Sequence, residues 1–270
     1  MLTLILGGGD LASGVALRLH HAGLRVIMSE LPQPLAVRRT VSFAEAIYTG
    51  ETTVEGVTAR RVKDPGDKLR VLNLLAKGQL PVLIDPQSIA INELHPAVIV
   101  DARMRKQRAE VIGSAGMLII GLGPGFEAGA NCHAVVETNR GHTLGRVYWQ
   151  GAPEADTGLP DTVLERHAER VLRAPAAGLV EPHAQIGDIL EVGQPVASVA
   201  GEILVAAFRG VLRGLIHPTV NVAAGMKIGD LDPRADPRLC RLVSDKSLAI
   251  GGAVLEAILS RANLRPHLWS

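Results

Sequence analysis

The first part of the chain alternates short apolar runs with amphipathic segments. Residues 2–6 form an apolar run that ends at three glycines, and residues 10–22 carry apolar side chains at helical spacing. A second apolar run follows at 24–29. This alternation is typical of βα units, in which helices join buried parallel strands. We therefore expect a strand at 2–6, a helix at 10–22 and a strand at 24–29.

The same alternation continues to about residue 120. Residues 34–48 have helical spacing, with Pro34 in a favoured position near the start of a helix. The apolar runs 81–85, 97–101 and 117–120 predict further strands. The expected fold of residues 1–165 is an α/β domain with a Rossmann-like parallel sheet that binds a nucleotide.

The pattern changes after about residue 173, where short β-type runs are separated by glycine and proline. Gly178 corresponds to Gly210, and Gly193 corresponds to Gly225. The offset is 32 residues in both cases. Such a repeat predicts a small barrel or sandwich with pseudo-two-fold symmetry over residues 173–236. Apolar positions at 247–262 then predict a terminal helix within 241–270, packing back on the first domain.

The two repeats resemble the biotinyl/lipoyl hammerhead. The resemblance rests on Gly187-Asp188 and Gly193-Gln194. Carrier domains of this kind have a modified lysine on the hairpin between the copies, whereas residues 198–202 are Ser-Val-Ala-Gly-Glu. We expect the shape of that domain without its carrier function.

Composition narrows the class of protein. Hydrophobic residues make up 47% of the 270 residues, charged residues make up 20%, and the net charge is +1. A packed core is expected and a nucleic-acid partner is not, because nucleic-acid binding needs a basic face. Cys132 and Cys240 match no metal or disulfide spacing and fit a reducing cytosol. The first apolar run is too short for a membrane span, so a cytoplasmic protein is expected.

The glycines after the first strand predict a nucleotide-binding turn. Gly7, Gly9 and Ala12 place small residues at the three positions of Gly-x-Gly-x-x-Gly/Ala. The first permits a tight turn, the second lets the backbone approach a pyrophosphate, and the third lets helix and strand pack closely. Gly8 and Asp10 complete the expected cofactor-binding set. Asp10 would repel a pyrophosphate if it pointed inward, so it either caps the helix or holds a cation.

Glu30 closes the second strand, where an acidic side chain commonly hydrogen-bonds ribose hydroxyls. Its carboxylate would repel a 2′-phosphate, which favours an NAD-like ligand over an NADP-like one. Arg38 and Arg39 follow a few residues later and would weaken that preference. We keep both arginines as candidate substrate contacts.

A second glycine loop, Gly121-Leu122-Gly123-Pro124-Gly125, follows the strand expected at 117–120. It is a candidate anion-binding loop, and a purely structural turn explains it equally well. Residues 137–142 indicate a hairpin turn that presents Arg140 and His142, a cation and an imidazole suited to anion binding or proton transfer. A hairpin without a function is the alternative.

Charged residues at strand and helix ends supply the remaining candidates. Asp85 and Asp101 end predicted strands, at the edge where parallel sheets bind ligands. The alternative is that they cap loops. The catalytic candidates are Asp101, His142 and Lys246, and the candidate substrate contacts are Arg38, Arg39, Asp85, Arg103 and Arg140.

Seven segments together resemble the YqeB-like accessory proteins of selenium-dependent molybdenum hydroxylases. These segments are residues 8–14, 30–46, 100–104, 121–126, 137–142, 227–234 and 244–252. The resemblance implies a role in maturing molybdenum hydroxylases of the xanthine dehydrogenase type. It also implies the hydroxylase apoenzyme or other maturation factors as partners. A homo-oligomer is left open.

Three functions fit these observations. The chain is an accessory protein that binds a nucleotide-bearing cofactor such as a molybdopterin dinucleotide at residues 7–12, an NAD-dependent oxidoreductase, or a non-catalytic scaffold for the hydroxylase. The oxidoreductase would use His142 or Lys246 as proton donor. We favour the first function, because the resemblance and the glycine turn agree.

Overall fold

The computed structural model describes residues 1–113, 116–155 and 168–268. The chain divides into two compact units. The first, called here the sheet unit, contains Met1–Pro34, Phe43–Thr157 and Val243–Ser270. The second, called the β-rich unit, contains Leu35–Ser42 and Gly158–Leu242. A short segment from the first part of the sequence therefore belongs to the β-rich unit.

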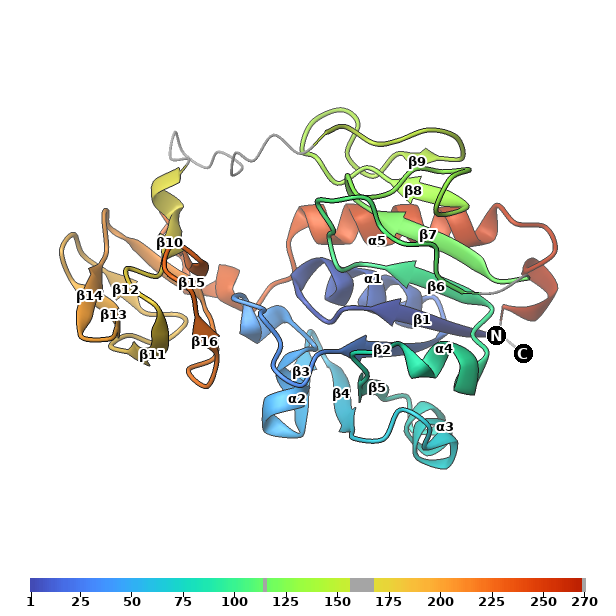
Figure 1. Cartoon of the computed structure of the whole chain (residues 1–270), viewed down its shortest axis with the longest axis horizontal. Coiled ribbons are helices and arrows are strands. Elements are labelled where there is room, and N and C mark those ends of the chain that lie inside the picture. Colours follow the sequence, from blue (N-terminus) through green and yellow to red (C-terminus); the bar gives the residue numbers. More distant parts are fainter. Residues whose placement is uncertain (114–115, 156–167, 269–270) are drawn as a thin grey trace. The chain divides into compact units, whose positions relative to one another are not determined.

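The sheet unit is built on a nine-stranded sheet with the order β3-β4-β5-β2-β1-β6-β7-β8-β9 (Figure 1). The neighbours from β4 to β8 are parallel, whereas the edge strands β3 and β9 are antiparallel to their partners. The strands are β1 Leu2–Leu6, β2 Arg25–Glu30, β3 Glu51–Val54, β4 Val57–Val62, β5 Leu80–Ile84, β6 Val98–Asp101, β7 Leu118–Leu122, β8 Ala134–Val136 and β9 Val147–Tyr148.

The expectation of a Rossmann-like parallel sheet is therefore wrong. The sheet is mixed, because its two edge strands run antiparallel to their neighbours. Glu55 and Gly56 form a two-residue turn with positive φ angles of 45° and 83°, which reverses the chain between β3 and β4. The β8–β9 hairpin reverses it again at the other edge. No helix occurs in the described residues between β6 and β7 or between β7 and β8.

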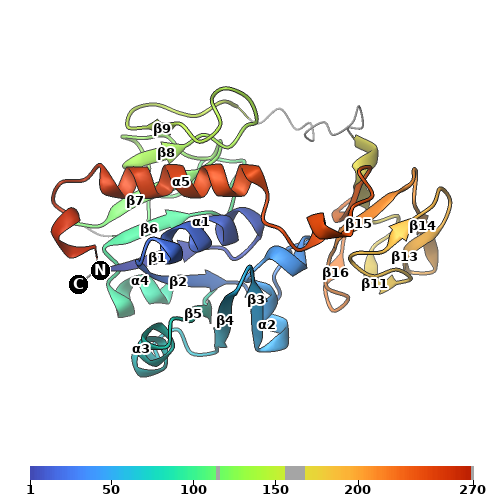
Figure 2. The same ribbon diagram turned by 180° about the vertical axis from the view of Figure 1, so that it is seen from behind.

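Helices cover both faces of this sheet. They are α1 Asp10–His21, α2 Glu45–Thr49, α3 Lys68–Ala76, α4 Ile89–Leu94 and α5 Asp245–Leu259. Helices α1 and α5 lie side by side on one face, as both ribbon views show (Figure 2). Apolar residues of α3 and α4 pack on the other face against Leu4, Leu6 and Ile99. None of the helices in the described residues combines the length and hydropathy needed to span a bilayer.

Glycines let α1 and α5 approach closely. A Cβ placed on Gly14 would lie 2.6 Å from the Cβ of Ser247, and one placed on Gly251 would lie 2.7 Å from the carbonyl oxygen of Gly14. No side chain fits at either position without movement of the opposite helix. The N-terminal turns of the two helices consequently lie beside each other.

The single helix expected at residues 34–48 is also wrong. This stretch contains the 3-10 helix η1 Arg39–Val41 and, after a break, α2. Phe43 donates its N–H to Ser13 Oγ, and Ala44 donates its N–H to Gly8 O. Because these amides bond to residues near the glycine turn, they cannot continue a helical hydrogen-bond ladder.

The β-rich unit contains two four-stranded antiparallel sheets, β10-β17-β15-β12 and β14-β13-β11-β16. Its strands are β10 Val171–Arg173, β11 Gly178–Pro182, β12 Ile189–Leu190, β13 Pro195–Val199, β14 Glu202–Val205, β15 Gly210–Leu215, β16 Asn221–Val222 and β17 Lys227–Asp232. The short helices η2 Ala168–Arg170 and η3 Pro237–Cys240 belong to the same unit, and η4 Arg265–His267 follows α5.

The 32-residue repeat reappears in the strand bounds. Strands β11, β12 and β13 start 32 residues before β15, β16 and β17 respectively. Exchanging the two copies converts the order of one sheet into the order of the other. Each sheet takes strands from both copies, so the copies interlock around buried residues that include Val180, Val199, Leu212 and Leu231.

Candidate functional site

The glycine turn lies at the carboxyl end of β1, between β2 and β6. Gly7 has a φ of +99°, which favours glycine, and its N–H donates to Ser29 O at 2.8 Å. The neighbouring residue Gly8 donates its N–H to Glu30 Oε2 at 2.7 Å. The structure therefore brings Glu30, which the sequence indicated as a ligand contact, directly onto the turn.

The Glu30 carboxylate is held by two backbone amides, because Oε1 also accepts the N–H of Leu31 at 2.8 Å. Burial raises the pKa of Glu30, and the bonds from Leu31 and Gly8 oppose that rise. The effect of burial on the pKa of Glu30 is larger than the opposing effect of the two bonds. The carboxyl group is therefore protonated more readily than an exposed glutamate, while it stays within reach of the turn.

The peptide group between Gly8 and Gly9 has a fixed orientation. The carbonyl oxygen of Gly8 accepts bonds from Ala44 N at 2.8 Å and from Ser13 Oγ at 3.2 Å. In a planar trans peptide the N–H points away from the preceding C=O. The N–H of Gly9 thus faces away from Ser13 and Ala44.

The space beside Gly9 is open. A Cβ placed on Gly9 would meet no atom within 4 Å. Gly9, Leu11 and Ala12 donate no backbone hydrogen bond within the part of the chain that the structure describes. Helix N-termini present such N–H groups, together with positive dipole potential, to anions.

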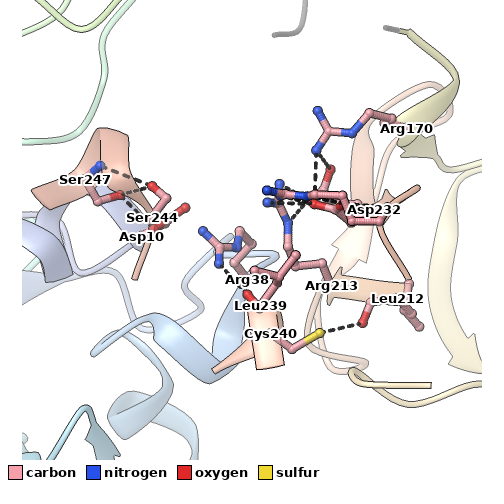
Figure 3. A network of polar contacts seen from close by, with 12 residues as sticks. Asp10, Arg38, Arg170, Leu212, Arg213, Asp232, Leu239, Cys240, Ser244 and Ser247 are labelled. Atoms are coloured by element: carbon pink, nitrogen blue, oxygen red, sulfur yellow. Dashed lines mark hydrogen bonds and ion pairs between the residues drawn. The ribbon is translucent and has the colours of Figure 1, made fainter. Parts of the chain in front are cut away.

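Asp10 bonds to α5. Ser247 Oγ donates to Asp10 Oδ1 at 2.9 Å, and Ser244 caps α5 by accepting the N–H of Ser247 at 3.1 Å (Figure 3). The hydroxyls of Ser244 and Ser247 are 2.9 Å apart. Asp10 is thus the first residue of α1 and bonds to the first turn of α5, whereas α1 has no side-chain cap of its own.

Asp101 and Arg103 form a pair on the neighbouring strand end. Asp101 is the register partner of Leu6, the residue before the turn, and is fully buried. It accepts bonds from Nε of Arg103 at 2.9 Å and from Nη2. The hydrogen bonds that Arg103 donates to Asp101 raise the pKa of Arg103, although burial opposes this. A rigid cation therefore stands beside the turn.

The loop between β8 and β9 contains a buried carboxylate that the sequence analysis missed. Glu137 accepts the N–H groups of Thr138, Asn139 and Glu154, each at 2.7 Å. An acid at the end of an apolar run, followed by Thr-Asn, is the signal for such a loop cap. These bonds brace the start of the loop and tie it to Glu154, which follows β9.

The other candidates of this loop and of α5 differ in their partners. Arg140 forms a bidentate pair with Asp245, both distances being 2.9 Å. His142 is exposed, and its carbonyl oxygen accepts a bond from Arg146. Lys246 is half-buried in the first turn of α5. The structure thus connects Arg140 to the start of α5.

Asp85 and the second glycine loop have structural contacts. Asp85 accepts the N–H groups of Ile89 and Ala90 at 2.7 and 2.9 Å, at the start of α4. A Cβ on Gly121 would overlap Phe126, and one on Gly125 would lie 2.5 Å from Arg105 O. Gly123 has a φ of +87°, and a Cβ there would lie 3.1 Å from Met104. Protein atoms fill these positions, which favours the structural explanation of the loop.

Arg38 and Arg39 belong to the β-rich unit. The buried Arg38 donates to Leu239 O and Leu242 O, both at 3.1 Å, and Arg39 Nε donates to Leu215 O at 2.8 Å. Backbone carbonyls are thus among the partners of both arginines. The two arginines and the glycine turn belong to different compact units.

A buried charge cluster in the β-rich unit was also missed. Asp230 and Asp232 face Arg170 and Arg213, and Asp232 also binds Arg234. Figure 3 shows Asp232 with Arg170 and Arg213. Burial alone would raise the pKa of Asp232, but the hydrogen bonds and charges of its arginines lower it to about 2. The signal in the sequence was Asp-Leu-Asp in a strand, since residues two apart share one face.

No group of three His, Cys, Asp or Glu side chains able to hold a metal occurs in the described residues.

These features define an α/β protein with a mixed sheet, an antiparallel β-rich unit and an open glycine turn. No family model matches the sequence. Over 258 residues, or 96% of this chain, it is 44% identical to "Uncharacterized protein YqeB" of Escherichia coli (strain K12). The chain spans 47% of the length of that relative. This identity supports a YqeB-like family over the aligned residues, and the relative's name states no function.

Solved structures give only distant likenesses. An aspartoacylase family protein of Mesorhizobium loti is 10% identical with a TM-score of 0.27, over 85% of this chain and 83% of that one. The ectoine utilization protein EutE of Ruegeria pomeroyi is 12% identical with a TM-score of 0.26, over 85% of each chain.

Proposed function

We propose that the chain binds a nucleotide-bearing ligand at the Gly7–Ala12 turn and acts as an accessory protein in the maturation of a molybdenum hydroxylase. The observation that carries the binding proposal is the open, donor-rich surface at Gly9. Its N–H faces away from the protein bonds of Gly8, and the amides of Leu11 and Ala12 follow in the first turn of α1. Phosphate oxygens are the acceptors that such a turn favours.

Two neighbouring residues support a ligand that has more than a phosphate. Glu30 reaches the turn from β2, where its carboxylate is suited to accept bonds from ribose hydroxyls. Arg103 supplies a cation on the β6 side, held in place by Asp101. A ligand with both a ribose and a diphosphate, such as a molybdopterin dinucleotide or NAD, would use both sides.

The maturation role is supported by the relationship to YqeB and by the long motif matches that define the resemblance. The proposed partners are the hydroxylase apoenzyme or other maturation factors. Since the chain spans 47% of that relative, these partners are proposed for the aligned part alone.

The test is calorimetry of the purified chain with cytidine diphosphate, NAD and NADP, together with mass spectrometry of any ligand released on denaturation. Gly9→Asp places a negative side chain in the open space at the turn, where no atom lies within 4 Å. Gly252→Asp is the matched control, because Gly252 in α5 is equally open. We expect the parent and Gly252→Asp to bind and Gly9→Asp to lose at least about tenfold in affinity.

Equal binding by Gly9→Asp and the parent would show that the turn is not the binding site. Release of a molybdopterin or cytidine compound would support the accessory role, whereas release of NAD would favour the oxidoreductase. A parent chain without nucleotide affinity would favour the scaffold.

A further inference from the structure

The chain passes between the two units at residues 34–35, 42–43 and 242–243 among the described residues. Each passage is close in sequence to a residue that contacts the glycine turn. Glu30 precedes the first passage, Ala44 follows the second and Ser247 follows the third. Three connections to the β-rich unit thus start or end at one small region of the sheet unit.

The tightest of these connections is the segment Leu35–Ser42, called here the strap. On the side of the sheet unit, Phe43 bonds to Ser13 Oγ at 2.8 Å, and Ala44 bonds to Gly8 O at 2.8 Å. Both bonds orient the Gly8–Gly9 peptide group. A displacement of Phe43 or Ala44 would therefore change the direction in which the Gly9 N–H points.

On the side of the β-rich unit, the strap is held by bonds to β15 and to the segment of η3 and Leu242. Arg39 binds Leu215 O in β15, and Thr40 Oγ1 donates to Cys240 O in η3. Arg38 donates to Leu242 O just after η3 and to Leu239 O within it, as Figure 3 shows for Leu239. The backbone of the strap also packs on β15, because a Cβ on Gly214 would lie 2.8 Å from Val37 O.

Only a short piece of chain joins these two sets of contacts. Ser42 is fully buried, and its hydroxyl donates to Arg38 O at 2.8 Å, which closes the strap just before Phe43. Arg39 in the β-rich unit and Ala44 on the turn are only five residues apart. This short segment therefore joins the contacts of the strap with β15 to the bonds that Phe43 and Ala44 make at the turn.

We propose that the strap couples the β-rich unit to the glycine turn, so that a ligand at the turn and the state of the β-rich unit regulate each other. The identity of the turn as a ligand site rests on the proposed function. Coupling between two sites is reciprocal by thermodynamics. If the packing of the strap on β15 changes the affinity for the ligand, binding of the ligand changes the stability of that packing by the same free energy.

The test compares two substitutions in the same strand. Gly214→Ala pushes a methyl group against Val37 O of the strap, whereas Gly210→Ala pushes one against Asp232 O of β17 at 2.7 Å. Both strain the β-rich unit, and only the first strains the strap. Amide hydrogen exchange of the full-length chain without ligand reports on Gly8, Phe43 and Ala44.

We expect Gly214→Ala to speed exchange at these three amides by about tenfold and Gly210→Ala to leave them as in the parent. Unchanged exchange in Gly214→Ala, or equal acceleration in both variants, would overturn the proposal. If Gly214→Ala does not fold, Arg39→Met removes the bond to Leu215 O more gently and is expected to act in the same direction.

Calorimetry with cytidine diphosphate and NAD separates this inference from the proposed function. Gly214→Ala is expected to weaken whichever of the two binds the parent by about fivefold, with no such change in Gly210→Ala. Absence of affinity in the parent would remove the proposed function, while the exchange experiment would still decide on the strap. Intact affinity and intact exchange in Gly214→Ala would remove the strap proposal alone.

Discussion

The carboxylate of Glu30 accepts a hydrogen bond from the backbone N–H of Gly8 at 2.7 Å, across 22 positions of sequence. This bond joins the end of β2 to the turn that follows β1. It satisfies the Gly8 amide, while the bonds of Ser13 and Ala44 to Gly8 O orient the next peptide group, that of Gly9. Glu30 thus shapes the turn at which we propose that a nucleotide binds.

Glu30→Gln should destabilise the sheet unit and remove a pH dependence. Glutamine offers one acceptor oxygen to two amides, which costs about 1–3 kcal/mol. Burial raises the pKa of Glu30 above 4.5, so the folded state binds the proton more tightly than the unfolded state. Stability is then greatest when Glu30 is protonated and is lost as the pH rises through its folded pKa.

Urea unfolding of the parent and Glu30→Gln between pH 4.5 and 7.5 tests this prediction. The advantage of the parent should shrink as the pH rises through that window. An advantage that grows toward neutral pH would mean that the folded-state pKa is lowered instead.

The crossing of α1 and α5 gives a prediction with an internal control. Gly251→Ala places a methyl group 2.7 Å from Gly14 O and should destabilise the sheet unit by about 1–3 kcal/mol. Gly252→Ala points into open space and should stabilise the helix by up to about 1 kcal/mol. Urea unfolding of both variants checks the opposite signs, and loss of stability in both would rule out a steric cause.

Asp85→Ala should affect stability and leave nucleotide binding unchanged. Its carboxylate caps α4 through Ile89 and Ala90, and removal of such a cap costs about 0.5–2 kcal/mol. Thermal unfolding and calorimetry on the same preparation measure the two effects separately. A loss of affinity in a folded Asp85→Ala protein would return this residue to the binding site.

Asp232→Asn should destabilise the β-rich unit by about 3–5 kcal/mol at neutral pH, because it leaves buried arginines without their carboxylate. The folded-state pKa of Asp232 is lowered from 3.8 to about 2. Its contribution is therefore fully present above 3.8 and is lost as the pH falls toward 2. Denaturant unfolding at neutral pH and near pH 3 should show the difference between parent and variant shrinking with acid. A constant difference would assign the effect to packing.

Local patterns determined several elements of this protein. Apolar periodicity predicted the strand at residues 2–6 and the helix at 10–22, which occur as β1 and α1. The 32-residue repeat predicted two β-rich copies, and apolar spacing predicted the terminal helix, which occurs as α5. These features depend on neighbouring residues, whose spacing the sequence displays directly.

Tertiary structure alone decided the mixed sheet, the break at residues 34–48 and the roles of several charged residues. Arg39 meets Leu215 across 176 positions, and Ser247 meets Asp10 across 237. No periodicity encodes such pairs, because they form only after distant segments pack. The turn's glycines were visible in the sequence, whereas the bonds that hold the turn come from Ser13, Glu30 and Ala44, which only the fold brings together.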